Sequence, residues 1–459
     1  MKAVKRVEVK INGCPSVPEF MAEYAERQME VSMKKRVVLM GMMMVGMMIV
    51  GIVIGLGGSV GCGGRMEDKV GEDGAGIEGV TQTPGWGEKT GFYPLTGTKE
   101  DEGVCRLPVS DGEKEQAASE CVFVMDAVRD IYERVDKGTA ANIVISRSDR
   151  ELMAERIGET GEAAVVADSG DGIGNGGGME EFLDGAGKGQ RGETAVFEVH
   201  GDGGIGQKWF RFDGERMELL YTCAVWDGFV PVVNETVRME VKDWSYTEKG
   251  WFIYELRVPE PPVVSEVVNG FEMIRVKPVE ERAREIMREF LEPVGYQGHN
   301  LFSSDWDGEH LDGLDFNGLF EYMYPLKYND AYEFSEDTRG IPAPVFEGVL
   351  TEFLPVSREQ LKEFAVFEEQ DNCYGWAALS CGNYTPKAFD MSKPEINGIS
   401  ENPDGTVSLT VDAVCQILGT DRLFTHELCV RFTDDGSIRF LGNRVLTPAE
   451  MPDYQYRVR

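Results

Sequence analysis

Residues 195–212 read AVFEVHGDGGIGQKWFRF and residues 217–226 read MELLYTCAVW, and these runs begin the part of the sequence that decides the fold. They are candidate β-strands, and in the runs that follow, alternation within Met239, Val241 and Trp244 and within Phe252, Tyr254 and Leu256 indicates one buried face. Pairs such as Asp213-Gly214 and Lys249-Gly250 lie between the runs and supply the positive φ that tight hairpins need. The sequence therefore predicts an antiparallel meander with strands at 195–200, 208–212, 217–226, 237–245, 251–258 and 271–277.

The segments before the meander mix helix and strand. Apolar residues recur at helical spacing over 118–136, so a helix is predicted there. A strand at 141–146, a helix at 151–157 with Ser148 as its N-cap, and a strand at 163–167 are expected to follow. Residues 168–192 are rich in glycine, are interrupted by a short apolar run at 179–183, and are predicted to form a mobile loop.

The segments after the meander are predicted to be helical first and then extended. Helices are expected at 279–291, 316–324, 343–353 and 357–367, with Ser357 as a good N-cap. Strands are expected at 407–415, 423–432 and 438–445. This order predicts an α+β fold, with one lobe over 118–277 that holds the meander and a second over 278–459 that ends in β-hairpins.

An uncharged apolar run at residues 37–56 predicts a membrane anchor. Its 20 residues would make a helix about 30 Å long, which matches the hydrocarbon core of a bilayer. The preceding Lys34, Lys35 and Arg36 favour a cytoplasmic N-terminal side, so the rest of the chain is expected outside the cell membrane. The anchor is expected to bind membrane lipid.

The end of this run resembles a bacterial lipoprotein signal. Residues 57–64 read GGSVGCGG, and the resemblance implies that Cys62 is lipidated and becomes the new N-terminus. Ser59 stands where such signals usually carry Leu, and the run is longer than the usual signal peptide. An uncleaved transmembrane helix over residues 33–62 is therefore the alternative.

Two segments flank the anchor. Residues 1–32 are either a doubtful N-terminal extension, with translation starting at Met33, or a short cytoplasmic tail. Residues 63–117 are acidic and rich in glycine, so they are predicted to form a flexible tether.

The net charge of the chain is −34, because 80 Asp and Glu residues outnumber 46 Lys and Arg residues. Such a surface repels phosphate groups, so nucleic acid is excluded as a partner. A cationic partner or a divalent metal ion is compatible with the charge, although solubility explains it equally well.

The nine cysteines contain no CxxC pair, which argues against a zinc ribbon or a thioredoxin-like redox site. Cys415 and Cys429 fall in two strands that are predicted to pair. A disulfide between them is one interpretation, and two small buried side chains are the other.

A dense acidic segment covers residues 305–315. It holds Asp305, Asp307, Asp312 and Asp315 as candidate calcium ligands, together with Glu309 and His310. The EF-hand pattern fails, because Gly308 comes fourth rather than sixth. The alternative is a solvated loop in which Asp315 caps the helix that begins near residue 316. Apart from this calcium ion, no cofactor is expected.

Other chemical motifs are weak. Two GxGxxG matches, at 172–177 and 201–206, lack the strand and helix that a dinucleotide site requires. His426 and Glu427 lie in one predicted strand and should point to opposite faces. No signature of a Ser or Cys nucleophile is present. Alternation predicts that most of four tryptophans belong to the core rather than to a sugar-binding or peptide-binding face: Trp209, Trp226, Trp244 and Trp251.

Several runs carry a resemblance to a known family. They are GYQ and NLF within 295–302, SDWD at 304–307, LDFN at 314–317, LFEYMY at 319–324, LFTHEL at 423–428 and FLGNRV at 440–445. Over residues 120–447 the chain resembles an uncharacterised family of membrane-anchored lipoproteins from gut Firmicutes, known as a domain of unknown function. The resemblance supports the lipoprotein interpretation and implies no activity.

Together these patterns predict a non-enzymatic extracytoplasmic lipoprotein that binds a cell-wall or protein ligand. The alternatives are an extracytoplasmic hydrolase or calcium-dependent protein that uses the segment 305–315, and an assembly subunit of an envelope complex.

Overall fold

The computed structural model describes residues 107–137, 143–167, 169–170, 172–257, 270–333, 340–377, 379, 384, 387–446, 454–456 and 458. They belong to one compact unit, Gly91–Arg459. The predicted extension, anchor and lipidation site at Cys62 lie outside the described residues, as does the tether up to residue 106. Among the described helices, none combines the length and the apolar character that a membrane span requires.

A seven-stranded sheet, the N-terminal sheet, confirms the predicted meander. Each strand from β2 to β7 pairs antiparallel with the next one along the chain, and β1 adds in parallel to β2. The turn glycines Gly214 and Gly250 have φ values of 101° and 93°, as tight hairpins require. The strands are β1 (Ala164–Val166), β2 (Gly192–Val199), β3 (Ile205–Phe212), β4 (Met217–Asp227), β5 (Val230–Tyr246), β6 (Trp251–Leu256) and β7 (Phe271–Arg275).

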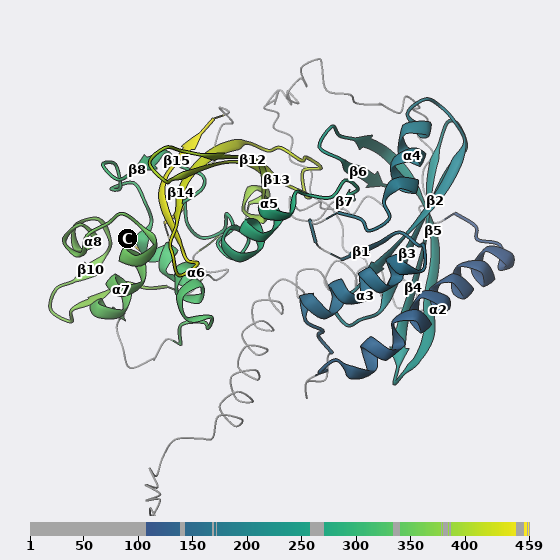
Figure 1. The fold of residues 1–459 in the computed structure, drawn as a ribbon, viewed down its shortest axis with the longest axis horizontal. Coiled ribbons are helices and arrows are strands. Elements are labelled where there is room, and N and C mark those ends of the chain that lie inside the picture. Colours follow the sequence, from purple (N-terminus) through teal and green to yellow (C-terminus); the bar gives the residue numbers. More distant parts are fainter. Residues whose placement is uncertain are drawn as a thin grey trace, which may run out of the picture. The chain divides into compact units, whose positions relative to one another are not determined.

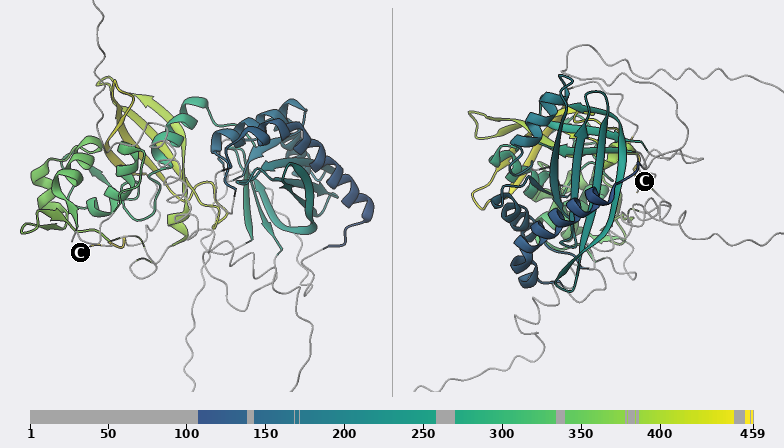
Figure 2. Two further views of the ribbon diagram at one scale, coloured as in Figure 1. Left: turned by 90° about the horizontal axis from the view of Figure 1, so that it is seen from below. Right: turned by 90° about the vertical axis from the view of Figure 1, so that its right-hand side faces the viewer.

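Helices α2 (Asp111–Arg134) and α3 (Arg147–Glu159) pack on one face of this sheet (Figures 1 and 2). Helix α2 begins before the predicted residue 118, because Ser110 and Glu113 form a capping box. The last residues of the predicted tether are therefore helical. The N-cap of α3 is Ser146 rather than Ser148. Residues 143–146 do not form the predicted strand, since they lead directly into this cap.

Helix α4 (Gly177–Ala186) lies inside the segment that was predicted to be a loop. Its apolar side chains Met179, Phe182 and Leu183 are buried in the core on the opposite face of the sheet. The glycines before it have a packing role, because a methyl group at Gly172 would lie 2.6 Å from the Cα atom of Pro278. The glycine-rich composition thus reflects close backbone contact.

A second sheet, the C-terminal sheet, is antiparallel throughout, with the order β12-β13-β14-β15-β8. Its strands are β8 (Trp306–Asp307), β12 (Lys393–Glu401), β13 (Val407–Val414), β14 (Thr425–Phe432) and β15 (Ile438–Val445). The three predicted strands are confirmed, and β8 and β12 were not predicted. A small sheet has the order β10-β11-β9 and consists of β9 (Ile341–Pro342), β10 (Phe367–Glu368) and β11 (Cys373–Tyr374).

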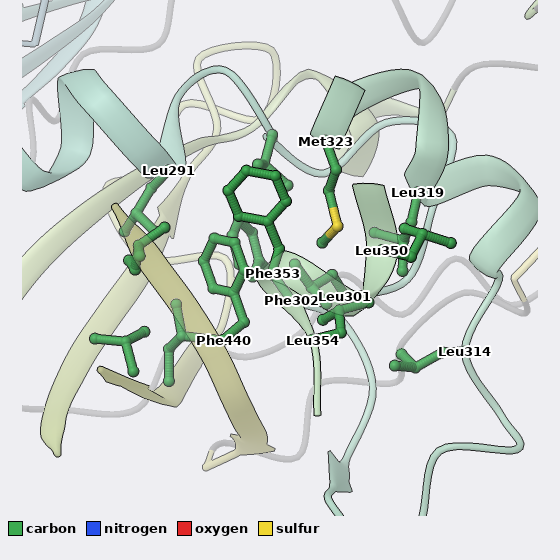
Figure 3. Close-up of a cluster of buried hydrophobic side chains, with 14 of the residues drawn as sticks. Leu291, Leu301, Phe302, Leu314, Leu319, Met323, Leu350, Phe353, Leu354 and Phe440 are labelled. Atoms are coloured by element: carbon green, nitrogen blue, oxygen red, sulfur yellow. The ribbon is translucent and has the colours of Figure 1, made fainter. Parts of the chain in front are cut away.

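The predicted helices of the C-terminal half are confirmed with adjusted ends. The first helix continues as a π-helix, and the second extends beyond the predicted residue 324. Their side chains and the C-terminal sheet enclose one core, in which Phe302, Leu350 and Phe440 lie together (Figure 3). The fold class is α+β, as predicted. The helices are α5 (Glu281–Ile286), π-helix η1 (Met287–Leu291), α6 (Phe316–Tyr328), α7 (Ala343–Phe353), α8 (Arg358–Phe364) and the short 3-10 helix η2 (Ala388–Met391).

Candidate functional site

The acidic loop, residues 305–315, uses its carboxylates for local hydrogen bonds. Oδ1 of Asp305 accepts from the backbone N–H of Val445 at 2.7 Å. Oδ1 of Asp307 accepts from the backbone N–H groups of Glu309 and His310 at 2.8 and 3.0 Å and lies 2.9 Å from the His310 imidazole Nδ1. These bonds fold the loop on itself and leave Asp305 and Asp307 with different partners.

The two remaining candidate ligands of this loop, Asp312 and Asp315, have different environments. Asp315 is buried, caps α6 by accepting from the N–H of Gly318 at 2.9 Å, and accepts from the Tyr454 hydroxyl at 2.6 Å. Asp312 is exposed. In the described part of the chain, no three His, Cys, Asp or Glu side chains are arranged to hold a metal ion. The N-cap at Asp315 is confirmed. The calcium site remains a prediction, and no cluster of ligands among the described residues supports it.

Of the two interpretations of Cys415 and Cys429, the disulfide is not formed, since both cysteines are free. Cys429 pairs with Ser408 near the start of β13, whereas Cys415 follows the last residue of that strand. Seven residues of strand separate the two positions by roughly 20 Å. The Cys415 thiol instead donates to the carbonyl oxygen of Ala388 at 3.3 Å.

His426 belongs to a buried polar network. Asn443 donates through Nδ2 to the carbonyl oxygens of Phe302 and Ser304, so its Oδ1 accepts from Nδ1 of His426 at 2.6 Å. The Tyr296 hydroxyl then donates to Nε2 at 3.1 Å. Burial lowers the pKa of His426 to about 4, so the ring is neutral at pH 7. As predicted, Glu427 points away from it.

Three tryptophans confirm the predicted core assignment. Trp209, Trp244 and Trp251 are buried, while Trp226 is only partly buried. Trp226 is the exception that leads to a surface feature, described below.

A set of buried and partly buried charges, the charge cluster, joins the two sheets. It consists of Lys249, Arg275, Glu395, Asp412 and Asp421. Nζ of Lys249 lies 2.8 Å from Oδ2 of Asp412, 3.6 Å from Oε1 of Glu395 and 3.9 Å from Oδ2 of Asp421. Glu395 and Asp412 are direct cross-strand partners on β12 and β13, and both are buried. The ammonium group, which comes from the turn between β5 and β6, therefore separates two carboxylates that would otherwise repel each other.

Further contacts complete the neutralisation of Glu395. Nε1 of Trp251 donates to Oε2 of Glu395 at 2.7 Å, and Nε of Arg275 lies 3.4 Å from the same oxygen. Burial raises the pKa of Glu395, against the pull of Arg275 and Lys249. The contact between the sheets continues through Trp251, Ile253 and Val414, which form a small apolar cluster.

Asp412 is held in its charged form. Burial alone would raise the pKa of its carboxyl, but Lys249, the hydrogen bond from Thr425 and the charge of Arg422 outweigh that effect and keep the pKa below its ordinary value. The charge cluster therefore ties the N-terminal sheet to the C-terminal sheet. Its residues lie far apart in the sequence and form no motif, so sequence reasoning missed it.

A second feature that the sequence reasoning missed is an exposed apolar surface at the end of the β4–β5 hairpin. We call Phe229, Val230 and Val232 the tip surface, and their exposed fractions are 49%, 60% and 40%. A methyl group at Gly228 would meet no atom within 4 Å, so the turn borders open space. Apolar side chains at and directly after a turn, where polar residues are usual, are the signal that could have identified it.

Aromatic and cationic side chains support the tip surface from behind. Trp226 stacks on Tyr132 of α2 with ring centroids 4.5 Å apart and an interplanar angle of 11°. Phe229 meets Tyr132 edge to face at 6.4 Å. Arg129 donates to the carbonyl oxygen of Phe229, and the Lys137 ammonium lies 5.3 Å from the Phe229 ring centroid. The tip is thus fixed to the end of α2.

Comparison with known proteins assigns a family but no activity. No curated protein and no solved structure matches the chain. A model described as a family of unknown function (DUF6070) matches residues 114–459, which is most of the chain and almost all of its described part. The chain therefore belongs to this family of unknown function.

Proposed function

We propose that this chain is a membrane-anchored protein of the outer face of the cell membrane, and that it binds a partner through the tip surface without catalysing a reaction. The observation that carries the proposal is the exposure of Phe229, Val230 and Val232 at one hairpin end. Exposed apolar side chains that gather at one end of the molecule mark interaction surfaces, because exposing them to water has a cost that binding removes.

The support behind the tip surface favours binding over accidental exposure. The stack of Trp226 on Tyr132 and the hydrogen bond from Arg129 hold the turn in one conformation. A surface that is already ordered loses less conformational entropy when a partner binds. Phe123, by contrast, is 55% exposed on the solvent face of α2 and serves as a matched control.

The membrane location rests on the sequence. The apolar run at 37–56 and the glycine-flanked Cys62 support either a lipid anchor or an uncleaved helix. The mass of the mature protein, purified from its own membrane, distinguishes the two. A lipid anchor predicts a chain that starts at Cys62 with attached acyl groups and a Cys62→Ser variant that is not lipidated. A full-length unmodified chain found free in the cytosol would refute the location altogether.

A photo-crosslinking amino acid at position 229 tests the binding surface in intact envelopes, with the same amino acid at position 123 as the control. The proposal expects a discrete adduct from position 229 and only background from position 123. Equal labelling from both positions would show that the tip surface has no partner.

A further inference from the structure

We propose that the partner of the tip surface is the lipid bilayer itself; this inference rests on the proposed function and names its partner. The side chains at the hairpin end are of the three kinds that a bilayer accepts at successive depths, namely apolar, aromatic and cationic. Phe229 is exposed on the α2 side of the hairpin end, and Val230 and Val232 are exposed on the opposite face of the strand. The partly buried Trp226 stacks on Tyr132 of α2, and the cations Arg129 and Lys137 lie against the Trp226 and Phe229 rings. Apolar groups prefer the hydrocarbon, aromatic rings prefer the interface, and cations prefer the phosphate level.

The form of the feature favours lipid over a protein partner. The tip surface lies on a two-residue turn between paired strands, with open space at Gly228. A protein partner would need a pocket shaped for this turn, whereas a bilayer deforms around it. The cations nearby are partly satisfied within the protein: Asp126 pairs with Arg129, and Lys137 donates to the carbonyl oxygens of Tyr132 and Val135. The exposed carboxylates of Glu133, Asp136 and Asp227 must stay at the water-facing side of the bilayer surface.

The chain that arrives from the anchor enters the fold against β5, the strand that also carries the tip. The backbone N–H of Leu107 donates to the carbonyl oxygen of Arg238 at 2.9 Å, and Nη1 of Arg238 donates to the carbonyl oxygen of Pro108 at 3.1 Å. Arg238 lies on β5, eight residues or about 26 Å from Val230. About 45 residues separate Cys62 from Leu107, and even a partly extended chain of that length spans this distance.

The tip surface alone is expected to have a low affinity for lipid. Attachment of the chain through its anchor is what allows a stable contact with the membrane. Three half-exposed apolar side chains bury little area, so the isolated tip would partition only weakly into lipid. A chain that is already attached to the membrane presents the tip at a high effective concentration, which converts a weak contact into a stable one.

The full chain, reconstituted into protein-free vesicles of phosphatidylglycerol and phosphatidylcholine, provides the test. A photo-crosslinking amino acid replaces Phe229 in one variant and Phe123 in the other, and lipid adducts are quantified by mass. We expect about tenfold more lipid adduct from position 229 than from position 123. A Val230→Asp change in the first variant should reduce that adduct severalfold, and near-ultraviolet circular dichroism from the Tyr132–Trp226 stack reports whether the hairpin remains folded.

Equal lipid labelling from positions 229 and 123 would overturn the bilayer as partner. If position 229 then yields a discrete protein adduct in native envelopes, including an adduct with a second copy of this chain, the proposed function survives and only the lipid inference fails. If position 229 labels neither lipid nor protein, both proposals fail together. Loss of lipid labelling in Val230→Asp, with the aromatic signal retained, supports the inference directly.

Discussion

The acidic loop and the charge cluster differ in how their charged residues are placed. Charged residues that are close together in the sequence need not have side chains that meet in the folded protein. The loop carries five acidic residues within eleven positions, yet their carboxylates make turns, a strand contact and a helix cap. The charge cluster draws Glu395, Asp412 and Asp421 toward one ammonium group from another sheet. Only the second arrangement makes the charges depend on one another, because burial there removes the screening by water.

The largest expected effect tests that dependence. Lys249→Met removes the ammonium and leaves Asp412 and Glu395 buried side by side. We expect the free energy of unfolding to fall by about 3–5 kcal/mol, the usual result when one partner of a buried ion pair is removed. Urea denaturation measures it, with Arg282→Met as the control because its pair with Glu401 is exposed and contributes at most about 1 kcal/mol. Equal losses in both variants would remove the distinction between buried and surface pairs.

Asp412→Asn should have the next largest effect and should depend on pH. We expect a loss of about 2–3 kcal/mol at pH 7, since Lys249 would lose its closest anion. The folded-state pKa of Asp412 lies below its ordinary value, so its stabilisation is present above about pH 4 and is lost as the pH falls through the lowered pKa. Denaturation from pH 7 to pH 3 should show the two proteins converging at low pH. A constant difference across that range would mean that the charge of Asp412 is not what stabilises the fold.

The acidic loop contains one carboxylate with a structural role, and its replacement should have an intermediate effect. Asp315→Ala removes the cap of α6 and the acceptor of the Tyr454 hydroxyl, so about 1–3 kcal/mol should be lost. The exposed Asp312, three residues earlier, should tolerate the same change. Thermal unfolding of both variants gives the comparison, and a similar midpoint for the two would contradict the assigned cap.

The smallest effect is expected for the pair that a calcium site or a hydrolase would need most. The double change Asp305→Asn and Asp307→Asn should leave the thermal midpoint nearly unchanged, because both side chains make exposed hydrogen bonds that Asn retains in part. Millimolar calcium should not shift the midpoint of either protein. A calcium-dependent rise in the wild type that the double variant lacks would restore the metal site and reverse the comparison.

The sequence predicted the elements whose pattern is local. Strands β5 and β6 follow from alternation, the turn at Asp213-Gly214 from residue type, and α8 from the cap at Ser357. Helix α4 was missed because its glycines suggested a loop, although they serve close packing against residues 276–278. Strand β12 was missed because Pro394 and Gly398 interrupt its pattern, and a register shift beside Gly398 accommodates them.

The sites were less predictable than the fold for a physical reason. A capping residue such as Asp315 acts on backbone groups within three positions, so its role is visible in the sequence. Lys249 acts on a carboxylate 163 positions away, and that pairing depends on how the two sheets pack. The predicted strands end at residue 226 and resume at 237, so Phe229 and Val230 fell in the gap between them, although β5 in fact begins at Val230.

The two hydrogen bonds that join residues 107–108 to Arg238 have a mechanical consequence. Arg238 also forms an ion pair with Glu113 in the first turn of α2. A pull on the N-terminal segment would therefore load β5 and the start of α2 together, because Leu107 and Glu113 both contact Arg238. Tension would reach the strand that carries the hairpin end before it reached the rest of the domain.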